Sequence, residues 1–407
     1  MRILVALTYY APHISGLTVY AQRLYKHLLA SGHEVTVLTS HYSSQLPKTE
    51  ALDGTTVIRS PVLLRANKGV LMPLFPWQAL RLVASHDIVH LHLPQIEASL
   101  VAIFAKLLRR PIVVTYQCDI ILPSRRARLA FSWLISLSHW LTCLLADRIV
   151  AISEDYAANS TLLRRFRSKV VSTLPLIEVE ESRDPSRSLR ERYELGGGPL
   201  IGFVGRFAED KGIGTLVDSV PHVRRGLPNA KYVLVGLTDR VPGERVYESV
   251  QPKIEQLGPT WTHLGVLSDA ELAEFYRTID VLVLPSINST ESFGMTQAEA
   301  MLMGTPVVTS DLPGVREAIR VTGMGELVPP GDEVALAKAI LAVLRDPEPY
   351  ARPKADIRKL FDSQQTVNFY EQLFSDLLGV EPVAGEPSKH TVAPARDAKA
   401  PRSPRAQ

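Results

Sequence analysis

Cysteine is nearly absent from this 407-residue sequence, which contains only Cys118 and Cys143. Two cysteines are too few for a disulfide framework or a cysteine-rich zinc site, so we expect a reducing, cytoplasmic compartment. The chain also has only a small excess of one sign of charge, because 45 basic and 42 acidic residues leave a formal net charge of +3. Nucleic-acid binding usually requires a strong basic excess, so we expect no nucleic-acid partner.

Long apolar runs are also rare. The run at the N-terminus is too short for a signal peptide, which agrees with a cytoplasmic protein. The exception is residues 129–146, which include no Asp, Glu, Lys or Arg and approach the length of a membrane span. Four polar residues recur there at helical spacing: Ser132, Ser136, His139 and Thr142. We therefore interpret the segment first as a core helix with one polar stripe, partly buried on a sheet.

A second interpretation of the same segment stays open. Three arginines precede the apolar run and two tryptophans lie within it: Arg125, Arg126, Arg128, Trp133 and Trp140. Basic residues beside an apolar helix with tryptophans suit a protein that rests on an anionic bilayer surface. Residues 125–145 therefore predict either ordinary core packing or peripheral attachment to the inner face of the cell membrane. A true membrane span is the least favoured interpretation.

The order of strand and helix patterns predicts an α/β protein with two domains. Apolar strand patterns separated by helical ones occur at residues 3–7, 35–38, 88–92, 112–115 and 149–152. A second series occurs at 200–204, 232–235, 281–284, 307–309 and 326–328. Such alternation indicates parallel sheets with helices on both faces, and 407 residues are too many for one ordinary core. Residues 181–198 between the series are charged and end in three glycines and a proline, which is typical of a linker.

Two carboxylates, Glu291 and Glu299, form the most informative pattern of the second series. Seven residues separate them, and the first follows the strand pattern at 281–284. Ligands bind at the carboxyl ends of strands in open α/β sheets. The helix that carries Glu299 would offer its N-terminus to an anion such as phosphate, while the carboxylates accept hydrogen bonds from sugar hydroxyls.

A loop from Gly205 to Gly212 follows the strand pattern at 200–204. Gly205 permits a tight turn, and Arg206 and Lys211 supply a planar guanidinium and a point charge that can both contact a diphosphate. Alone, these two side chains are best interpreted as solvated surface cations. Together with the two glutamates the arrangement is specific.

With these motifs the chain resembles the retaining glycosyltransferases of family 4. The loop from Gly205 to Gly212 is similar to their phosphate-binding Gly-Arg loop, and the segment from Glu291 to Glu299 is similar to their Glu-x7-Glu signature. Residues 311–317 resemble the segment that follows in the same family. The resemblance extends from Met1 to about Leu378 and is strongest in the second domain.

The resemblance implies the GT-B fold, in which two doubly wound, Rossmann-like α/β domains face a cleft. Residues 1–180 would form the acceptor domain and residues 199–360 the nucleotide-sugar-binding domain, joined by the linker at 181–198. A C-terminal helix at 361–379 would pack back on the first domain. Residues 380–407, rich in Pro, Ala, Lys and Arg, are expected to be a disordered tail.

The resemblance also implies a role for each site residue. Arg206 and Lys211 would neutralise the leaving diphosphate, so neither a metal nor another cofactor is expected. Glu299 would hold the ribose hydroxyls, and Glu291 would bind hydroxyls of the transferred sugar. The backbone N–H groups expected at the sugar and the distal phosphate are those of Phe293, Gly294 and Met295. The backbone of residues 264–267 would frame the base.

The first domain departs from the family at two positions. The family often has a Gly-Gly pair after the first strand, whereas this chain has the single Gly16, with Ser15 as another source of a hydroxyl. The family usually has a histidine where this chain has Gln117, which can donate and accept hydrogen bonds but cannot titrate. We still expect Gly16 and Gln117 beside the donor sugar. His90 and His92 are expected on opposite faces of a strand, with at least one of them in the core.

Together these patterns predict a retaining hexosyltransferase that uses a UDP- or GDP-sugar. Its acceptor would be a glycolipid, a lipid-linked sugar or a polysaccharide of the cell surface, so its partners are a nucleotide sugar and a glycan or lipid-linked acceptor. Two alternatives remain open. One is a sugar-nucleotide epimerase of the same fold, and the other is a catalytically silent sugar-nucleotide-binding protein, which Gln117 and the single glycine would suit.

Overall fold

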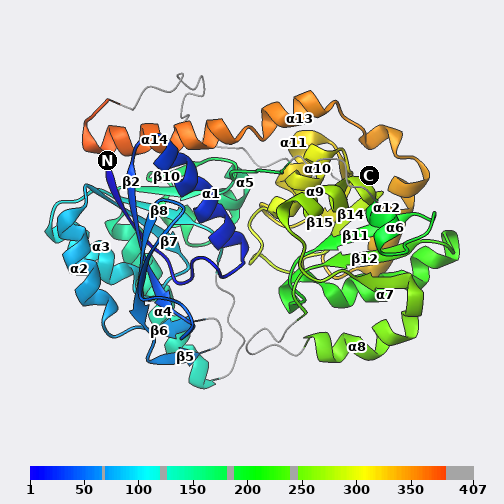
Figure 1. The fold of residues 1–407 in the computed structure, drawn as a ribbon, viewed down its shortest axis with the longest axis horizontal. Coiled ribbons are helices and arrows are strands. Elements are labelled where there is room, and N and C mark those ends of the chain that lie inside the picture. Colours follow the sequence, from blue (N-terminus) through cyan, green and yellow to red (C-terminus); the bar gives the residue numbers. More distant parts are fainter. Residues whose placement is uncertain (67–68, 120–125, 181–187, 239–245, 382–407) are drawn as a thin grey trace, which may run out of the picture.

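The computed structural model describes residues 1–66, 69–119, 126–180, 188–238 and 246–381. Two α/β domains lie side by side, and the chain crosses between them twice (Figure 1). The predicted tail from 382 onward, residues 181–187 of the predicted linker and Arg125 lie outside the described residues.

The first domain is built on an eight-stranded sheet with strand order β10-β9-β8-β7-β1-β2-β4-β3. All neighbouring strands are parallel except β3, which pairs antiparallel with β4 at the edge. Its elements are β1 (Arg2–Ala6), α1 (Gly16–Ala30), β2 (Glu34–His41), β3 (Thr49–Leu52), β4 (Thr55–Pro61), β5 (Leu64–Ala66), β6 (Gly69–Leu71), α2 (Phe75–Ser85), β7 (Ile88–Leu93), α3 (Ala98–Leu107), β8 (Ile112–Tyr116), α4 (Arg126–Leu145), β9 (Arg148–Ala151), α5 (Glu154–Asn159), η1 (Leu163–Phe166) and β10 (Val170–Ser172).

The second domain is built on a six-stranded parallel sheet with strand order β13-β12-β11-β14-β15-β16. Counted along the chain this is the order 3-2-1-4-5-6 of dinucleotide-binding folds. Its elements are α6 (Leu189–Arg192), β11 (Leu200–Val204), η2 (Glu209–Lys211), α7 (Ile213–Gly226), β12 (Lys231–Val235), α8 (Val246–Leu257), η3 (Gly258–Thr260), β13 (Trp261–His263), α9 (Asp269–Thr278), β14 (Val281–Leu284), α10 (Met295–Met303), β15 (Val307–Ser310), α11 (Glu317–Thr322), β16 (Gly325–Val328), α12 (Glu333–Arg345), η4 (Glu348–Tyr350) and α13 (Lys354–Leu360).

Helices cover both faces of each sheet, which explains why the strand patterns are almost continuously apolar. In β1, Ile3 and Val5 belong to the core under α1, while Leu4 and Ala6 belong to the core on the opposite face. The second sheet is covered on one face by α7 and α12, which are packed against each other. The alternation of strands and helices in the sequence therefore predicted the layers correctly.

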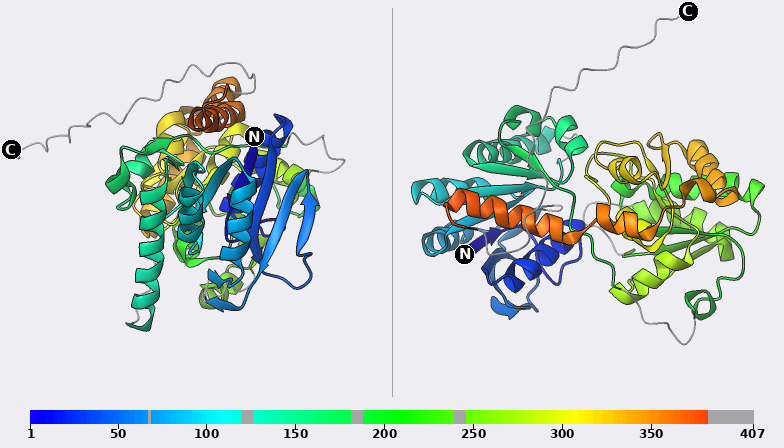
Figure 2. Two further views of the ribbon diagram at one scale, coloured as in Figure 1. Left: turned by 90° about the vertical axis from the view of Figure 1, so that its left-hand side faces the viewer. Right: turned by 90° about the horizontal axis from the view of Figure 1, so that it is seen from above.

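Helix α14 (Ser363–Leu378) leaves the second domain and crosses over the first (Figure 2, right). Its Tyr370 hydroxyl lies 2.8 Å from the Tyr20 hydroxyl of α1 and 2.7 Å from Thr115 Oγ1 of β8. The preceding helix α13 packs instead against α10 and α11 of the second domain. The C-terminal segment therefore lies where the GT-B resemblance places it.

The predicted linker is shorter than expected, because its second half belongs to the second domain. Ser188 and Glu191 form a capping box that starts the short helix α6. Leu189 is fully buried, and its N–H donates to Glu274 Oε1 of α9 at 2.6 Å. A capping box and one buried leucine are weak signals beside a run of charged residues and glycines, so composition alone placed this segment in a linker.

Candidate active site

Two helix N-termini face each other between the domains. Helix α1, on the side of the first domain that faces the second (Figure 1), begins at Gly16, and α10 begins at Met295. A Cβ atom on Gly16 would lie 3.8 Å from Met295 Cε, so the side chain of the first residue of α10 reaches the start of α1. The N-cap of α10 is Gly294, and no side chain caps this helix, so its first N–H groups stay available to a ligand. Two positive helix ends attract an anion.

Two glycines with positive φ hold the candidate phosphate loop against the carboxyl end of β14. Gly212 has φ +68°, and a Cβ there would lie 1.8 Å from the Pro285 carbonyl oxygen. Gly294 has φ +77°, and a Cβ there would lie 2.5 Å from Leu284 Cδ2. Ile287 N donates to the Asp210 carbonyl oxygen at 3.0 Å and joins the loops. The Gly205–Gly212 loop and the Glu291 loop therefore form one unit.

Lys211 and Glu291 are paired with each other in the structure. Lys211 Nζ donates to Glu291 Oε2, and the two side chains are only 19% and 14% exposed. Arg206 forms no ion pair with any residue in the described part of the chain. Burial lowers the pKa of His13, and the charge of Arg206 lowers it further, which places Arg206 beside the loop before α1. Of the two predicted diphosphate ligands, Lys211 is thus held by the predicted sugar ligand Glu291, and Arg206 lies near His13 of the first domain.

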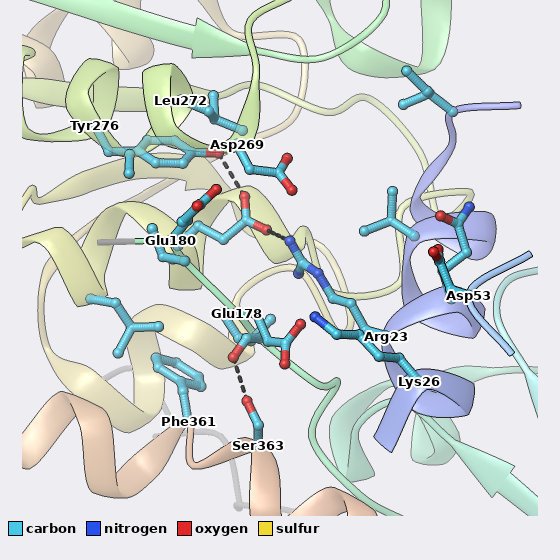
Figure 3. Close-up of a pocket in the computed structure, with 18 of the residues that line it drawn as sticks. Arg23, Lys26, Asp53, Glu178, Glu180, Asp269, Leu272, Tyr276, Phe361 and Ser363 are labelled. Carbon is cyan, nitrogen blue, oxygen red and sulfur yellow. Dashed lines mark hydrogen bonds and ion pairs between the residues drawn. The ribbon is translucent and has the colours of Figure 1, made fainter. Parts of the chain in front are cut away.

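Glu299 is 5% exposed and is held from both domains. Arg23 Nη2 of α1 lies 2.9 Å from Glu299 Oε1, and the Tyr276 hydroxyl of α9 donates to Oε2 at 2.8 Å (Figure 3). Each carboxylate oxygen has two lone pairs, so Glu299 can still accept bonds from ligand hydroxyls. Neither partner was predicted, because an ion pair across 276 residues leaves no local sequence signal.

A cavity of about 1020 Å³ extends from Glu299 between the domains (Figure 3). Its charged lining comprises His13, Arg23, Lys26, Asp53, Glu178, Glu180, Asp269, Glu299, Arg358 and Asp362. Arg206, Lys211 and Glu291 do not line it. Glu299 therefore faces a space large enough for part of a ligand.

An ion pair fixes residues 311–317 to the first domain. Asp155, near the start of α5, accepts hydrogen bonds from Arg316 Nε at 2.9 Å and Nη2 at 2.8 Å. It also accepts from Gly314 N at 2.7 Å. Burial opposes ionisation of Asp155, but the bonds from Arg316 and Gly314 lower the pKa of this carboxyl below its ordinary value. The segment that resembles the family after Glu299 is therefore an interdomain contact.

The residues that follow β8 are linked to the loop that carries Glu291 through one tyrosine of α5. The Tyr156 hydroxyl donates to the Ser289 carbonyl oxygen at 3.2 Å and accepts from Asp119 N at 2.6 Å. Burial, and next the charge of Glu291, raise the pKa of Cys118 to about 12, which places this neutral thiol beside the site. Cys118 is therefore part of the wall opposite the phosphate loop.

Gln117 lies on this wall, 8% exposed, with Nε2 at 3.4 Å from His92 Nδ1. The expectation that His90 and His92 point to opposite faces was wrong. Residues two apart in a strand share a face, and both imidazoles lie within hydrogen-bond distance of the Tyr25 hydroxyl. Gly16 lies at the start of α1, and the hydroxyl of Ser15 caps that helix together with Thr18.

Buried polar groups without partners lie after β7, in the first domain. Gln95 and Glu97 are 2% and 6% exposed, and their side-chain nitrogen and oxygen atoms have no hydrogen-bond partner among the described residues. Burial raises the pKa of Glu97 to about 7, although backbone N–H groups nearby oppose this. Gln95 N donates to His139 Nε2 of α4 at 3.3 Å. Sequence reasoning missed this pair, because Gln and Glu in a loop are usually solvated.

Helix α4 buries several polar residues and exposes several large apolar ones. Of the predicted polar stripe, His139 and Thr142 are buried, whereas Ser136 is exposed. Ser138, His139 and Thr142 are buried, and Ser138 Oγ donates to the Ile96 carbonyl oxygen at 2.5 Å. The exposed large side chains are Trp133, Leu134, Leu137, Trp140 and Leu144, at 37% to 66% of their surface. We call these five residues the α4 apolar face.

A second exposed apolar group lies at the same end of the first domain as the start of α4 (Figures 1 and 2). It comprises Leu63, Leu64, Leu71, Leu74 and Trp77, from β5, β6, α2 and the residues beside them. Within the described part of the chain, no helix combines the length and the apolar character that a membrane crossing needs.

Two family models match the chain, one in each domain. The model described as "Glycosyl transferase 4-like domain" matches residues 15–176, and "Glycosyl transferases group 1" matches residues 198–346. The solved structure of Anabaena Alr3699/HepE in complex with UDP and glucose has the same fold. Its TM-score is 0.74 at 20% identity, over 92% of this chain and 100% of that chain. The fold and the matched domains define a GT-B glycosyltransferase.

The chain belongs to the family 4 glycosyltransferases, as its motifs indicated. It is 33% identical to the phosphatidyl-myo-inositol mannosyltransferase of Mycobacterium leprae, over 53% of this chain and 58% of that protein. The alignment thus spans less than two thirds of this relative. The chain is also 27% identical to the GDP-mannose-dependent alpha-mannosyltransferase of Mycobacterium tuberculosis, over 86% of this chain and 90% of that protein.

Proposed function

We propose that the protein is a retaining, metal-independent hexosyltransferase that uses a UDP- or GDP-sugar and a glycolipid, lipid-linked or polysaccharide acceptor. One observation carries the proposal: the N-termini of α1 and α10 meet beside Arg206, Lys211 and two glutamates. Positive helix ends and two cations suit a diphosphate, and carboxylates suit hydroxyls. The relative that is GDP-mannose-dependent makes GDP-mannose the first donor to test.

The donor would divide the charged groups between its parts. Lys211 would leave Glu291 for the diphosphate, which frees the Glu291 carboxylate for hydroxyls of the sugar. Arg206 and the N–H groups of Gly294 and Met295 would contact the same phosphates. Glu299 would hold the ribose, next to the cavity. Cations fixed at the leaving group stabilise the charge that develops there, which commonly contributes a hundredfold or more in rate.

Retention follows if the acceptor hydroxyl attacks from the face that the diphosphate leaves. The bond from the anomeric carbon to the phosphate oxygen breaks, and a bond to the acceptor oxygen forms on the same face. The acceptor proton goes to the departing diphosphate, whose negative charge makes it the nearest base. No side chain then needs to titrate, which suits Gln117 in the place of the family's histidine.

The acceptor would bind in the first domain, where Gln95 and Glu97 have buried polar atoms without partners. A polyol or sugar headgroup supplies both donors and acceptors, so it can satisfy a carboxamide and a carboxyl group together. These residues adjoin α4, whose outer face is apolar. A headgroup at Gln95 and Glu97 with its lipid portion along the α4 apolar face fits this arrangement. It also fits the phosphatidyl-myo-inositol acceptor in the name of a relative.

The α4 apolar face and the second apolar group suggest peripheral membrane attachment, in line with the basic residues expected around 125–128. Liposome flotation tests this. We expect the wild type to float with anionic vesicles and the variant Trp133→Ser/Trp140→Ser to float much less. Leu360→Ser, at an exposed leucine of α13 on the second domain, is the control. A wild type that stays at the bottom with anionic lipid would contradict attachment.

The transferase itself is tested by incubating the protein with GDP-mannose or UDP-glucose in the presence of EDTA. We expect nucleoside diphosphate to be released only when a polyol- or sugar-headed lipid is present, and the product to keep the anomeric configuration of the donor. Donor conversion without any acceptor would favour the epimerase. A wild type no more active than Arg206→Ala on every donor and acceptor would favour a silent binding protein.

A further inference from the structure

A chain of buried hydrogen bonds runs behind the active site and ends at Gln117. Its members lie on α1, β7, β8 and α14, and in order they are Tyr20, Tyr370, Thr115, His90, Tyr25, His92 and Gln117. The six contacts measure 2.8, 2.7, 2.7, 2.8, 2.5 and 3.4 Å. The first six members are buried, so water does not complete their bonding.

The two imidazoles are neutral. Burial lowers the pKa of His92 to about 3, and burial, with a smaller contribution from the neighbouring His92, lowers the pKa of His90 well below its ordinary value. A neutral imidazole carries one N–H and offers one nitrogen as acceptor. Each of the first six members of the chain therefore has one polar hydrogen to donate.

All bonds of the chain must point in one direction. The Tyr25 hydroxyl contacts His90 Nδ1 and His92 Nε2 and has one hydrogen, so it donates to one ring and accepts from the other. Since each neutral ring accepts at one nitrogen and donates at the other, the direction at Tyr25 sets the direction at Thr115 and at Gln117. Two arrangements are consistent, and they differ only in polarity.

Donor counting separates the two arrangements. If the bonds point from Tyr20 to Gln117, each of the first six members donates its one polar hydrogen to the next member, and all six contacts are hydrogen bonds. If they point the other way, the carboxamide donates the first bond, and one of the buried hydroxyls of Thr115, Tyr370 and Tyr20 keeps a hydrogen without an acceptor, in a continuous chain that of Tyr20. Tyr20 is 1% exposed and has no second hydrogen-bond partner among the described residues. A buried hydroxyl without an acceptor is costly, so the first arrangement is favoured.

We infer that the chain is polarised toward Gln117, so that His92 donates to the carboxamide oxygen and holds the carboxamide NH₂ toward the cleft. Which end of a carboxamide is oxygen and which is nitrogen is assigned from its hydrogen bonds. The inferred orientation therefore places Gln117 Oε1, in place of Nε2, at 3.4 Å from His92 Nδ1. His92 is then a positioning residue. This part rests on the proposed donor site: there, Gln117 is a fixed hydrogen-bond donor to one oxygen of the sugar. It therefore selects sugars that have a hydrogen-bond acceptor at that position.

The direct test is the tautomer of each histidine, measured by long-range ¹H–¹⁵N correlation on protein with labelled histidine. His90 and His92 are assigned by the single variants His90→Gln and His92→Gln. We expect both rings to be neutral with the hydrogen on Nδ1 between pH 6 and 8. A hydrogen on Nε2 of either ring would overturn the polarity. This readout needs no substrate, so it is independent of the proposed function.

The second test uses GDP-mannose or UDP-glucose, whichever is turned over, with each sugar hydroxyl replaced in turn by hydrogen or by fluorine. At the position that contacts Gln117, we expect kcat/KM to fall about tenfold for the deoxy donor and less for the fluoro donor, because fluorine still accepts. Gln117→Leu should abolish this difference, and His92→Leu should reduce it. His86→Gln removes another buried imidazole of the same domain and should not change it.

Equal losses for the fluoro and deoxy donors at a Gln117-dependent position would overturn the inference, because the carboxamide would then present its oxygen. If no position depends on Gln117 although both tautomers are as expected, the placement of Gln117 beside the sugar is overturned, and with it that part of the proposed donor site. The polarity of the chain would stand in that case.

Discussion

The two walls of the cleft are built in different ways. On the second domain, glycine-dependent loops and a helix N-terminus converge, and Lys211 is already paired with Glu291. On the first domain, Gln95 and Glu97 are buried without partners, and the adjoining helix α4 exposes tryptophan and leucine. The difference indicates a donor site that is largely formed in advance. In the acceptor site, in contrast, the buried polar groups would find hydrogen-bond partners in the bound acceptor, and the exposed apolar side chains of α4 would be covered by lipid.

The largest effect should come from the donor wall. Arg206→Ala is expected to lower kcat by about a hundredfold or more, because a fixed cation at the departing diphosphate is lost. Steady-state kinetics with GDP-mannose or UDP-glucose measures it. Lys253→Ala, at an exposed lysine paired with Asp218, is the matched control and should leave kcat unchanged. Equal kinetics for the two variants would remove Arg206 from the reaction.

The glycine of the phosphate loop tests whether the donor wall is rigid. Gly212→Ala should lower the free energy of unfolding by about 2 to 3 kcal/mol, because φ is +68° and the added Cβ would meet the Pro285 carbonyl oxygen. Gly214→Ala is the control, since a Cβ there meets nothing within 4 Å. Urea unfolding measures both. A loss as small for Gly212→Ala as for Gly214→Ala would show that the loop adapts.

The contact between the walls is tested at Asp155. Asp155→Asn should cost about 2 kcal/mol of stability, because the largely buried Arg316 loses its two bonds to a carboxylate and keeps only the ion pair with the exposed Asp311. Asp87→Asn breaks the more exposed pair with Arg2 and should cost less than about 1 kcal/mol. Because the folded pKa of Asp155 is lowered, its stabilisation is present above the ordinary carboxyl pKa. That stabilisation is lost as pH falls through the folded pKa, below about pH 4. Unfolding curves of Asp155→Asn and wild type that coincide at pH 7 would contradict the contact.

The last effect is a pH dependence on the acceptor wall. Burial raises the pKa of Glu97 to about 7, so its folded form prefers to be protonated. The stability from this group is complete below the ordinary carboxyl pKa and is lost as pH rises through 7, by about 2 kcal/mol between pH 5 and 8. Glu97→Gln should flatten this slope in urea unfolding. An unchanged slope would mean that Glu97 is ionised in the folded protein.

The sequence predicted the donor wall better than the acceptor wall for a physical reason. Backbone loops that bind phosphates need glycines and cations at fixed spacing, and Gly205, Arg206 and Lys211 show that spacing. The partners of Glu299, Arg23 and Tyr276, come from distant helices and follow no such spacing. On α4 the helix was predicted correctly, but the predicted polar stripe does not share one environment, because His139 and Thr142 are buried and Ser136 is exposed. The spacing of polar residues along a helix does not show whether a buried group, such as the Ile96 carbonyl oxygen, accepts a hydrogen bond from them.

The measurement that tests the donor site most directly is thermal unfolding of the wild type and Arg206→Ala with GDP, UDP and their sugars. A nucleotide present at a hundred times its dissociation constant stabilises the folded state by about 2.7 kcal/mol. We predict that the GDP or the UDP series raises the unfolding temperature of the wild type and raises that of Arg206→Ala much less. No stabilisation by either nucleotide, or equal stabilisation of both proteins, would contradict a diphosphate site at the junction of α1 and α10.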